Sequence, residues 1–285
     1  MSLRVIDWET FSDPSRSSGQ PAWEDKPLAL SIGVFDGVHR GHQRLITKIL
    51  KYAGEYGGLG GVITFRQNPR RVLHPKSYPG DIYGLPRKLR ILEELGVGFA
   101  VLIDFSGDFS RITGEEFTVL LRKRRISYLA VGANFRCGYH LDTSARQIRE
   151  MMSEGGTRTE LVSQLRMGGA PVSSSRIRQA VLNGDIAGAS ELLGRPYSLD
   201  LSGLCPRLEG NVFSWEAEGR VLPPAGLYSV FIRSGAGVFP AEISLDSGRL
   251  VLGWNLGAGG FAESEVPPGT GDFLNGGLLS IEFRP

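Results

Sequence analysis

The sequence predicts an α/β protein in which a doubly wound parallel sheet is followed by a small all-β barrel. Short apolar runs alternate with amphipathic helical patterns from residue 28 to residue 198, the order expected of parallel strands joined by helices. After Tyr197 the helical patterns stop and short alternating runs replace them. A length of 285 residues suits two domains. We therefore expect a tail over 1–27, a first domain over 28–198 and a barrel over 199–285.

The elements of the first domain follow from the spacing of its apolar residues. The run 28–34 is short and apolar, as expected for a strand that is buried on both faces. Apolar side chains then recur at helical spacing over 39–54, and two glycines end that pattern. Right-handed crossovers should join successive parallel strands. The alternation continues with strands at 61–65, 99–104, 128–131 and 160–165 and with helices at 86–95, 114–124, 144–153, 173–183 and 186–193.

The two flanks of this domain have a different texture. The segment 1–27 is polar and rich in Ser, Pro and Gly after Phe11, so we expect a tail with one short strand at 3–8. The stretch 199–285 contains 15 glycines, and its short alternating runs are separated by turn signals. That pattern is typical of a small β-barrel. The expected barrel strands are 212–215, 226–233, 239–245, 250–254 and 278–283.

Composition and charge exclude several classes of protein. The net charge is +2, but residues 199–285 carry −5 and the first 198 residues therefore carry +7. A basic half could serve a nucleic acid, a membrane surface or a small polyphosphate. No apolar run approaches the ~18 residues of a membrane span, and no secretory signal is present, so we expect a cytoplasmic protein without a membrane partner. Two cysteines, Cys137 and Cys205, and four histidines predict neither a disulfide framework nor a protein-held metal.

The strongest local signal is the run Gly33-Val-Phe-Asp-Gly-Val-His39-Arg-Gly-His42. A strand ends here, a turn with two glycines follows, and a helix opens with His39 and His42 on one face of its first turn. A helix N-terminus offers unpaired N–H groups and a partial positive charge. Asp36 could cap the turn or contact a nucleotide hydroxyl. The run therefore predicts an anion site, above all one for a polyphosphate.

Two plainer interpretations of the histidines were weighed against this one. They could be ordinary surface residues or half of a metal site, but a metal site needs three or four donors. The remaining histidines, His74 and His140, do not stand at a ligand-like spacing. Neither the Walker pattern nor the dinucleotide-binding glycine pattern after a strand is present. The phosphate interpretation is the one that the pattern favours.

A second signal is the run Ser173-Ser-Ser-Arg-Ile-Arg178, where three hydroxyls enter a helix. Ser173 is a suitable N-cap, which is the purely structural interpretation. One cap needs only one serine, whereas three serines with Arg176 and Arg178 can make a second anion cradle with bidentate contacts.

Together these two motifs resemble the prokaryotic riboflavin kinase/FMN adenylyltransferase (FAD synthetase) family. Further segments agree in order: 64–69 resembles the flavin loop of that family and 131–136 its phosphate- and flavin-contacting turn. The spacers 88–96 and 112–117 and the closing segment 192–197 also match, so the resemblance covers about residues 28–198. It implies a nucleotidyltransferase domain with a Rossmann-like sheet.

The resemblance implies transfer of AMP from ATP to FMN, which gives FAD and pyrophosphate, with Mg²⁺ bridging phosphates through substrate oxygens and water. Catalysis would then depend on positioning and charge stabilisation. The residues implied are His39, His42, Asn134 and Arg178 for catalysis, Gly33, Phe35, Asp36, Gly41, Ser173, Ser174 and Ser175 for ATP, and Phe65, Pro69, Asn134, Phe135 and Arg136 for FMN.

The chain departs from the family at several places. Gln67 stands where the flavin loop usually has a second proline, and Cys137 replaces an aromatic residue near the flavin. The Pro-Thr-Ala-Asn run of the kinase module does not occur after residue 199, and this half is acidic. The pattern therefore favours a degenerate kinase module and a monofunctional FMN adenylyltransferase.

Other functions stay open at this point. They are a bifunctional riboflavin kinase/FAD synthetase, an enzyme of the same superfamily with another phosphate acceptor, such as a nicotinamide or pantetheine phosphate, and a non-enzymatic module that binds flavin nucleotide. Nucleic-acid binding is weakly supported, because the basic residues are dispersed and no nucleic-acid-binding motif is present. The oligomeric state is also open, with a monomer as one option.

Overall fold

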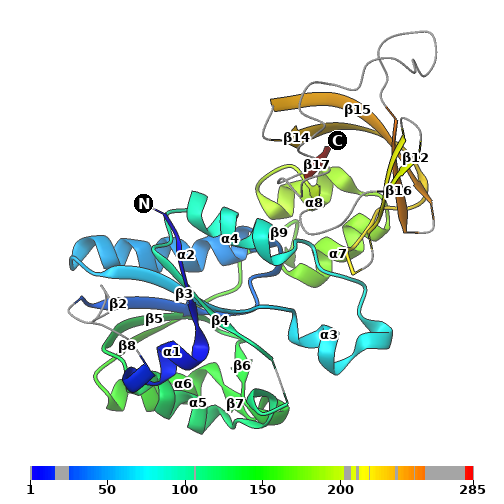
Figure 1. The fold of residues 1–285 in the computed structure, drawn as a ribbon. Helices are drawn as coiled ribbons and strands as arrows, with labels where there is room; N and C mark the ends of the chain where they lie inside the picture. The colour runs from blue at the N-terminus through cyan, green and yellow to red at the C-terminus, as the bar shows by residue number, and fades with distance from the viewer. Residues whose placement is uncertain are drawn as a thin grey trace. The chain divides into compact units, whose positions relative to one another are not determined.

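The computed structural model consists of two compact units (Figure 1). The first combines residues 1–78 and 88–172, and the second combines 79–87 and 173–285. This division groups 173–198 with the β-rich part, whereas the sequence prediction assigns that segment to the first domain. The structure describes residues 2–16, 26–105, 107–201, 207–209, 212–217, 219–234, 237–246, 248–253 and 280–284.

The first unit contains a parallel sheet with helices on both faces, as predicted. The strand order is β1-β4-β3-β2-β5-β8. Helices α2 and α4 cover one face, and α1, α5 and α6 cover the other (Figure 1). The strands are β1 (Arg4–Asp7), β2 (Leu28–Ile32), β3 (Leu59–Phe65), β4 (Phe99–Ile103), β5 (Ile126–Gly132) and β8 (Arg158–Val162). The helices are α1 (Trp8–Ser12), α2 (Arg40–Glu55), α3 (Pro69–Leu73), α4 (Leu85–Glu94), α5 (Gly114–Arg122) and α6 (Ala145–Glu154).

Burial explains why these strands are continuous apolar runs. Every residue of β2 and of β4 is buried, as expected for central strands covered on both faces. Gly61 of β3 faces the Phe99 ring so closely that an added Cβ would lie 2.3 Å from it. A glycine at this position therefore allows the aromatic ring to pack directly against the backbone of the neighbouring strand.

The N-terminal segment is part of this core. The strand expected at 3–8 is present as β1, which pairs in parallel with β4 at the edge of the sheet. Trp8 and Phe11 of α1 are buried in the core, and Arg124 donates hydrogen bonds to the carbonyl oxygens of Thr10 and Phe11. Residues 4–12 therefore form more than the predicted tail with a short strand. They extend the sheet and pack into the core on the face that α5 and α6 cover.

The strand order defines where a ligand crevice should form. The chain runs from β2 outward through β3 to β4 on one side, and then through β5 to β8 on the other side of β2. In open parallel sheets, ligands bind outside the carboxyl ends of the strands at the point where the order reverses. Here that point lies between the carboxyl ends of β2 and β5.

The second unit is built around a curled antiparallel sheet (Figure 1), as predicted. Its strand order is β11-β17-β14-β15-β16-β13-β12. Residues of β15 alternate between buried and exposed positions, the pattern of a sheet with one covered face. The strands are β11 (Ser198–Asp200), β12 (Arg207–Glu209), β13 (Val212–Glu216), β14 (Gly226–Ser234), β15 (Gly237–Asp246), β16 (Arg249–Gly253) and β17 (Ser280–Phe283). Cys205 lies outside the described residues.

Two helices and the segment 79–87, which lies between the two parts of the first unit in the sequence, complete the second unit. Helices α7 (Ser174–Leu182) and α8 (Ile186–Leu193) contact each other. The segment 79–87 pairs with the β-rich part: the Asp81 N–H donates to the Gly219 carbonyl at 2.8 Å, and the Val221 N–H donates to the Asp81 carbonyl at 3.0 Å. Among the helices described in the two units, none has both the length and the apolar character needed to cross a bilayer.

Candidate active site

The turn that follows β2 is strained and buried. Phe35 adopts the left-handed conformation, with φ 53° and ψ 27°, and Val38 has φ 39°. Positive φ is a genuine outlier for a β-branched residue and is found where the surroundings enforce it. Both side chains are completely buried, so core packing holds the turn in place. Gly37, with φ 76°, supplies the remaining left-handed position at low cost.

His39 and His42 form one stacked pair at the start of α2. Their ring centroids are 3.6 Å apart and their planes differ by 14°. His39 is the N-cap, and its Nδ1 accepts a hydrogen bond from the His42 backbone N–H at 3.3 Å. Because Nδ1 acts as an acceptor, a neutral His39 carries its proton on Nε2, which can then donate to an anion.

Because Gly41 has no side chain, the His39 ring can lie directly against it. A Cβ at this position would lie 3.1 Å from both Cε1 and Nδ1 of His39. A larger residue would therefore displace the imidazole from its cap position. The role of Gly41 in an ATP site stays a prediction; the structure shows that the absence of a side chain here leaves room for the His39 ring.

The predicted acceptor residues follow the two strands that flank β2. Phe65 ends β3, and Pro69 begins α3 after the N-cap Asn68, whose Oδ1 accepts from the Arg70 N–H at 3.1 Å. After β5, a tight turn is closed by the hydrogen bond from the Phe135 N–H to the Gly132 carbonyl at 2.9 Å. Strands β3, β2 and β5 are neighbours. The turns that follow these three strands therefore leave the same edge of the sheet. The turn after β2 and the start of α2 contain Gly33, Phe35, Asp36, His39, Gly41 and His42, the turn after β3 contains Phe65 and Pro69, and the turn after β5 contains Asn134, Phe135 and Arg136.

Lys88 is a residue of this edge that the sequence analysis treats only as part of a spacer. Its side chain is 6% exposed, and its Nζ donates to the Phe65 carbonyl at 2.7 Å, to Thr64 Oγ1 at 3.2 Å and to the Val34 carbonyl at 3.4 Å. A signal was available, because Lys88 precedes the buried residues Ile91 and Leu92 at the i, i+3, i+4 spacing of an apolar helix face.

Aromatic side chains gather next to the predicted acceptor loop. The Phe65 ring contacts Phe105 and Phe109, with centroids 5.9 and 6.3 Å away. Phe109 in turn meets the edge of Trp8 at 5.7 Å. Arg66 forms an ion pair with Asp7 at the end of β1. The N-terminal segment thus reaches the acceptor loop through both a ring contact and a charge pair, which the sequence alone did not indicate.

The turn after β5 is held by its own backbone contacts. Arg136 is exposed, and its Nε donates to the Leu141 carbonyl at 2.9 Å. His140 and Leu141 have positive φ values of 54° and 57°. Burial, with a smaller contribution from the Asp142 carboxylate, raises the pKa of the Cys137 thiol to about 12. Cys137 is therefore protonated at neutral pH and is not a nucleophile.

The serine–arginine group lies in the second unit. Ser173 is the N-cap of α7, and its Oγ accepts from the Arg176 N–H at 3.2 Å. Arg178 is 5% exposed, and its Nε donates to the Gly80 carbonyl at 2.8 Å. Ser174 is half-buried and Ser175 is exposed. The joint action of this group with His39 and His42 stays a prediction.

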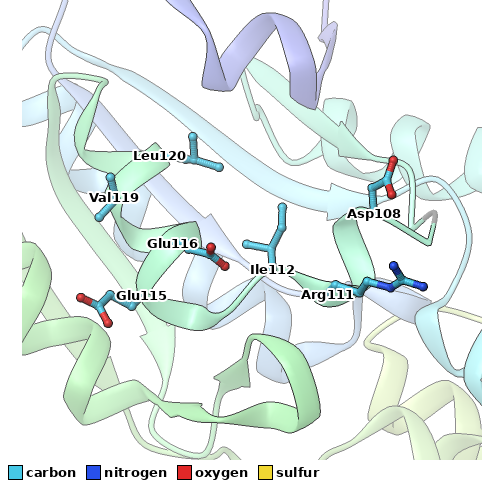
Figure 2. Close-up of a pocket in the computed structure, with 7 residues that line it drawn as sticks. All are labelled: Asp108, Arg111, Ile112, Glu115, Glu116, Val119 and Leu120. Carbon is cyan, nitrogen blue, oxygen red and sulfur yellow. The ribbon is translucent and has the colours of Figure 1, made fainter.

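A surface pocket lies elsewhere in the first unit, at the start of α5 (Figure 2). None of the predicted site residues lines it, and three carboxylates against one guanidinium make it a poor anion site. Within the described part of the chain, no group of three or more His, Cys, Asp or Glu side chains could hold a metal ion. The pocket is lined by Asp108, Arg111, Ile112, Glu115, Glu116, Val119 and Leu120.

Comparison with known proteins assigns the chain to a family. The sequence model of the FAD synthetase family matches residues 22–176, which is more than half of the chain. A "Bifunctional riboflavin kinase/FMN adenylyltransferase" of Buchnera aphidicola subsp. Schizaphis graminum is 30% identical over 174 residues, 60% of this chain and 56% of the relative. The protein of the same name from Haemophilus influenzae is 26% identical over 79% of this chain and 72% of its own length.

A solved structure agrees in fold. The "Macrolide-efflux Protein from Streptococcus pneumoniae" matches with a TM-score of 0.76 and 21% identity, over 99% of this chain and 89% of that one, which shows a shared fold. The chain spans about half the length of the first curated relatives that it matches, 56% and 55%. The family match covers the strands and turns that carry the stacked histidines and the acceptor loops. The chain therefore belongs to the FAD synthetase family.

Proposed function

We propose that this chain transfers AMP from ATP to FMN, with FAD and pyrophosphate as products. The observation that carries the proposal is the common origin of three turns at the carboxyl edge of β3, β2 and β5. One turn has the features of a phosphate site, and the other two resemble acceptor loops of the family that the chain belongs to. A nucleotide and its acceptor can meet at such an edge.

On the nucleotide side, the turn after β2 receives the triphosphate. The Nε2–H of His39, the ring of His42 and the N–H groups at the start of α2 offer donors for phosphate oxygens. The strained, fully buried Phe35 and Val38 keep these donors in place before the substrate binds. Donors that need no rearrangement are most effective where charge develops in the transition state.

On the acceptor side, FMN lies between the turns that follow β3 and β5. Phe65 and its neighbouring rings provide an apolar wall for a planar isoalloxazine, and Asn134 and Arg136 provide hydrogen-bond donors for its phosphate. An FMN phosphate oxygen attacks the α-phosphorus of ATP, the bond to the β-phosphate oxygen breaks, and pyrophosphate leaves in line. The protein contributes position and charge, and no covalent enzyme intermediate forms.

Mg²⁺ enters this reaction as part of the substrate MgATP. The ion prefers phosphate oxygens and water when few carboxylates are available. Ser173–Ser175 and Arg178 are proposed to hold the departing β- and γ-phosphates. The Arg178 Nε donates to the Gly80 carbonyl at 2.8 Å.

We also propose that the chain lacks riboflavin kinase activity. The support is the missing Pro-Thr-Ala-Asn run after residue 199 and the net charge of −5 over 199–285. The second candidate is a bifunctional enzyme, which the names of the matched relatives and the all-β second unit favour. The two candidates differ in one measurable product, FMN formed from riboflavin.

The test offers purified full-length chain FMN, riboflavin and MgATP, together and separately, and identifies products by mass spectrometry. We expect FAD and pyrophosphate from FMN, and no FMN from riboflavin. His42→Ala should lower FAD formation about 10²-fold or more, as loss of a transition-state donor does. His74→Gln, at an exposed position outside the site, should retain the wild-type rate. Absence of FAD contradicts the adenylyltransferase proposal, and FMN formation at a comparable rate contradicts the loss of kinase activity.

A further inference from the structure

Lys88 joins the nucleotide turn to the acceptor loop. Its ammonium group lies within hydrogen-bonding distance of the Phe65 carbonyl, at 2.7 Å, and of the Val34 carbonyl, at 3.4 Å. Val34 is the residue before the strained turn, and Phe65 is the first residue of the acceptor loop. One buried cation therefore contacts the ends of two adjacent strands, each of which leads into a different half of the proposed site.

The contact is reinforced by a hydroxyl between the two strands. Thr64 is completely buried, and its Oγ1 donates to the Val34 carbonyl at 2.9 Å. The same Oγ1 accepts from Lys88 at 3.2 Å. The Val34 carbonyl thus accepts from both side chains, and the resulting triangle fixes the position from which the left-handed Phe35 departs.

Burial of this lysine needs a physical reason. A lysine with 6% exposure loses most of its hydration, which is costly unless its donors are satisfied. Its hydrogen bonds to Val34, Thr64 and Phe65 go to groups at the carboxyl edge of the sheet. A leucine or methionine at the same position of the apolar face of α4 would fill the space without this cost. A lysine retained there is therefore expected to serve the site that its ammonium group contacts.

We propose that Lys88 is a positioning residue that couples the ATP turn to the FMN loop. It holds the two turns at the separation needed for in-line attack. Loss of this tie lets the turns move independently, and a displacement of about 1 Å is enough to lower a rate by about 10²-fold. The inference rests on the proposed adenylyl transfer and assigns to Lys88 a role that acts through the two turns and not through contact with a substrate.

The primary test compares Lys88→Met with the wild type and with Arg90→Met. Arg90 lies on the same helix and is exposed, so its substitution removes a cation of α4 without touching the tie. We expect Lys88→Met to lower kcat per folded molecule by about 10²-fold and to raise KM for ATP and for FMN. Arg90→Met should match the wild type. Equal kcat and KM values for Lys88→Met, per folded molecule, would overturn the inference.

Chemical rescue separates positioning from folding. In Lys88→Ala, propylamine can occupy the space of the missing side chain and return an ammonium group to the two carbonyls. We expect propylamine to raise the rate of Lys88→Ala at least tenfold. Propanol, which lacks the charge, should not raise it. Equal rescue by both compounds, or by neither in a folded variant, would contradict an electrostatic tie.

Two further measurements cover a variant that does not fold and a proposed function that fails. Thr64→Val removes the bridging hydroxyl at nearly constant volume, and we expect about a tenfold loss in kcat that is not additive with Lys88→Met.

Hydrogen exchange needs no activity: in Lys88→Met, amides of 33–38 and 64–69 should exchange faster together, unlike in Arg90→Met. If the wild type makes no FAD, the proposed function fails, while coupled exchange still supports the tie. Unchanged exchange in both segments overturns it.

Discussion

The two units use buried and exposed surface in opposite ways. In the first unit, β2 and β4 are buried at every position, so the ends of the strands are the places where polar groups can gather. In the second unit, β15 alternates between buried and exposed residues, so its polar side chains spread along one face. A sheet covered on both sides thus concentrates chemistry at one edge, and a half-covered sheet disperses it.

Backbone strain follows the same division. Within the described residues, every non-glycine residue with positive φ belongs to the first unit: Phe35, Val38, His140 and Leu141. Two of these stand in the turn after β2, and two stand beyond the turn after β5. Strain persists only where the surroundings enforce it, and it is common at binding sites. The edge of the parallel sheet is therefore the region where substitutions should affect activity most.

The largest expected effect tests that division directly. His39→Ala should lower FAD formation about 10²-fold or more, because it removes both the proposed phosphate donor and the cap of α2. Glu216→Gln, on an exposed position of β13, should leave the rate unchanged. Steady-state rates measured with FMN and MgATP check both. A loss of similar size from Glu216→Gln would show that the antiparallel sheet also contributes a reacting group and would contradict the comparison.

A smaller effect is expected from Gly41→Ala. The added Cβ would lie 3.1 Å from the His39 ring and displace it, so we expect about a tenfold loss in kcat. Alanine is the better helix former by about 1 kcal/mol, which offsets the weakened cap, so the midpoint of thermal unfolding should change little. Gly54→Ala in the same helix meets no atom within 4 Å and is the matched control, with raised stability and wild-type activity. Wild-type activity of Gly41→Ala would show that the position of the His39 ring does not control the rate.

The N-terminal segment provides a sharper test of what supports the acceptor loop. Trp8→Leu removes a buried ring that is stacked on Phe117 at 5.2 Å and contacts Phe109 edge-on. We expect a loss of about 2 kcal/mol in the free energy of unfolding, measured with urea, and a raised KM for FMN with an unchanged KM for ATP. Val5→Ala, at a half-exposed position of β1, should change stability by less than about 0.5 kcal/mol. Equal shifts in both KM values would contradict a role confined to the acceptor loop.

The smallest effect concerns an ion pair of the first unit away from the site. Burial raises the pKa of Glu160, but hydrogen bonds from Lys48 and Tyr128 outweigh it and hold the pKa below its ordinary value. A carboxylate with a lowered folded-state pKa stabilises the fold above its ordinary pKa, and this contribution is lost as pH falls through the folded-state pKa. Glu160→Gln should therefore reduce stability by less than about 1 kcal/mol at pH 7, because the pair is partly exposed.

Denaturant titrations at neutral and acidic pH check this prediction. The stability difference between the wild type and Glu160→Gln should shrink with acidification. A stability difference that grows in acid would contradict a lowered pKa of Glu160 in the folded state.

Much of this molecule could be predicted from local sequence. Strands such as 28–34 were recognisable because burial on both faces requires continuous apolar runs, and β2 occupies Leu28–Ile32. The cap by Ser173 followed from the chemistry of one hydroxyl near a helix start. The histidines were recognisable because their spacing places both in one helical turn, where the structure stacks their rings.

Other features depend on contacts between distant parts of the chain. The hydrogen bond from Arg178 to Gly80 joins residues 98 positions apart, and the place of β1 beside β4 depends on pairing that no local pattern encodes. The sequence analysis names Lys88 only as part of a spacer, because its burial and its contacts with residues 34, 64 and 65 depend on folding. The strain at Phe35 was not predictable either, because left-handed geometry in a non-glycine residue is imposed by the surrounding packing.

The cap of α2 has a consequence for the chemistry of one ring. His39 can close the helix only while its Nδ1 holds a lone pair, because a proton on that nitrogen would turn the acceptor into a second donor facing the His42 N–H. The tautomer that closes the helix is therefore the one whose remaining N–H, on Nε2, faces away from the backbone, so helix closure and the donor offered by the ring depend on the same proton position.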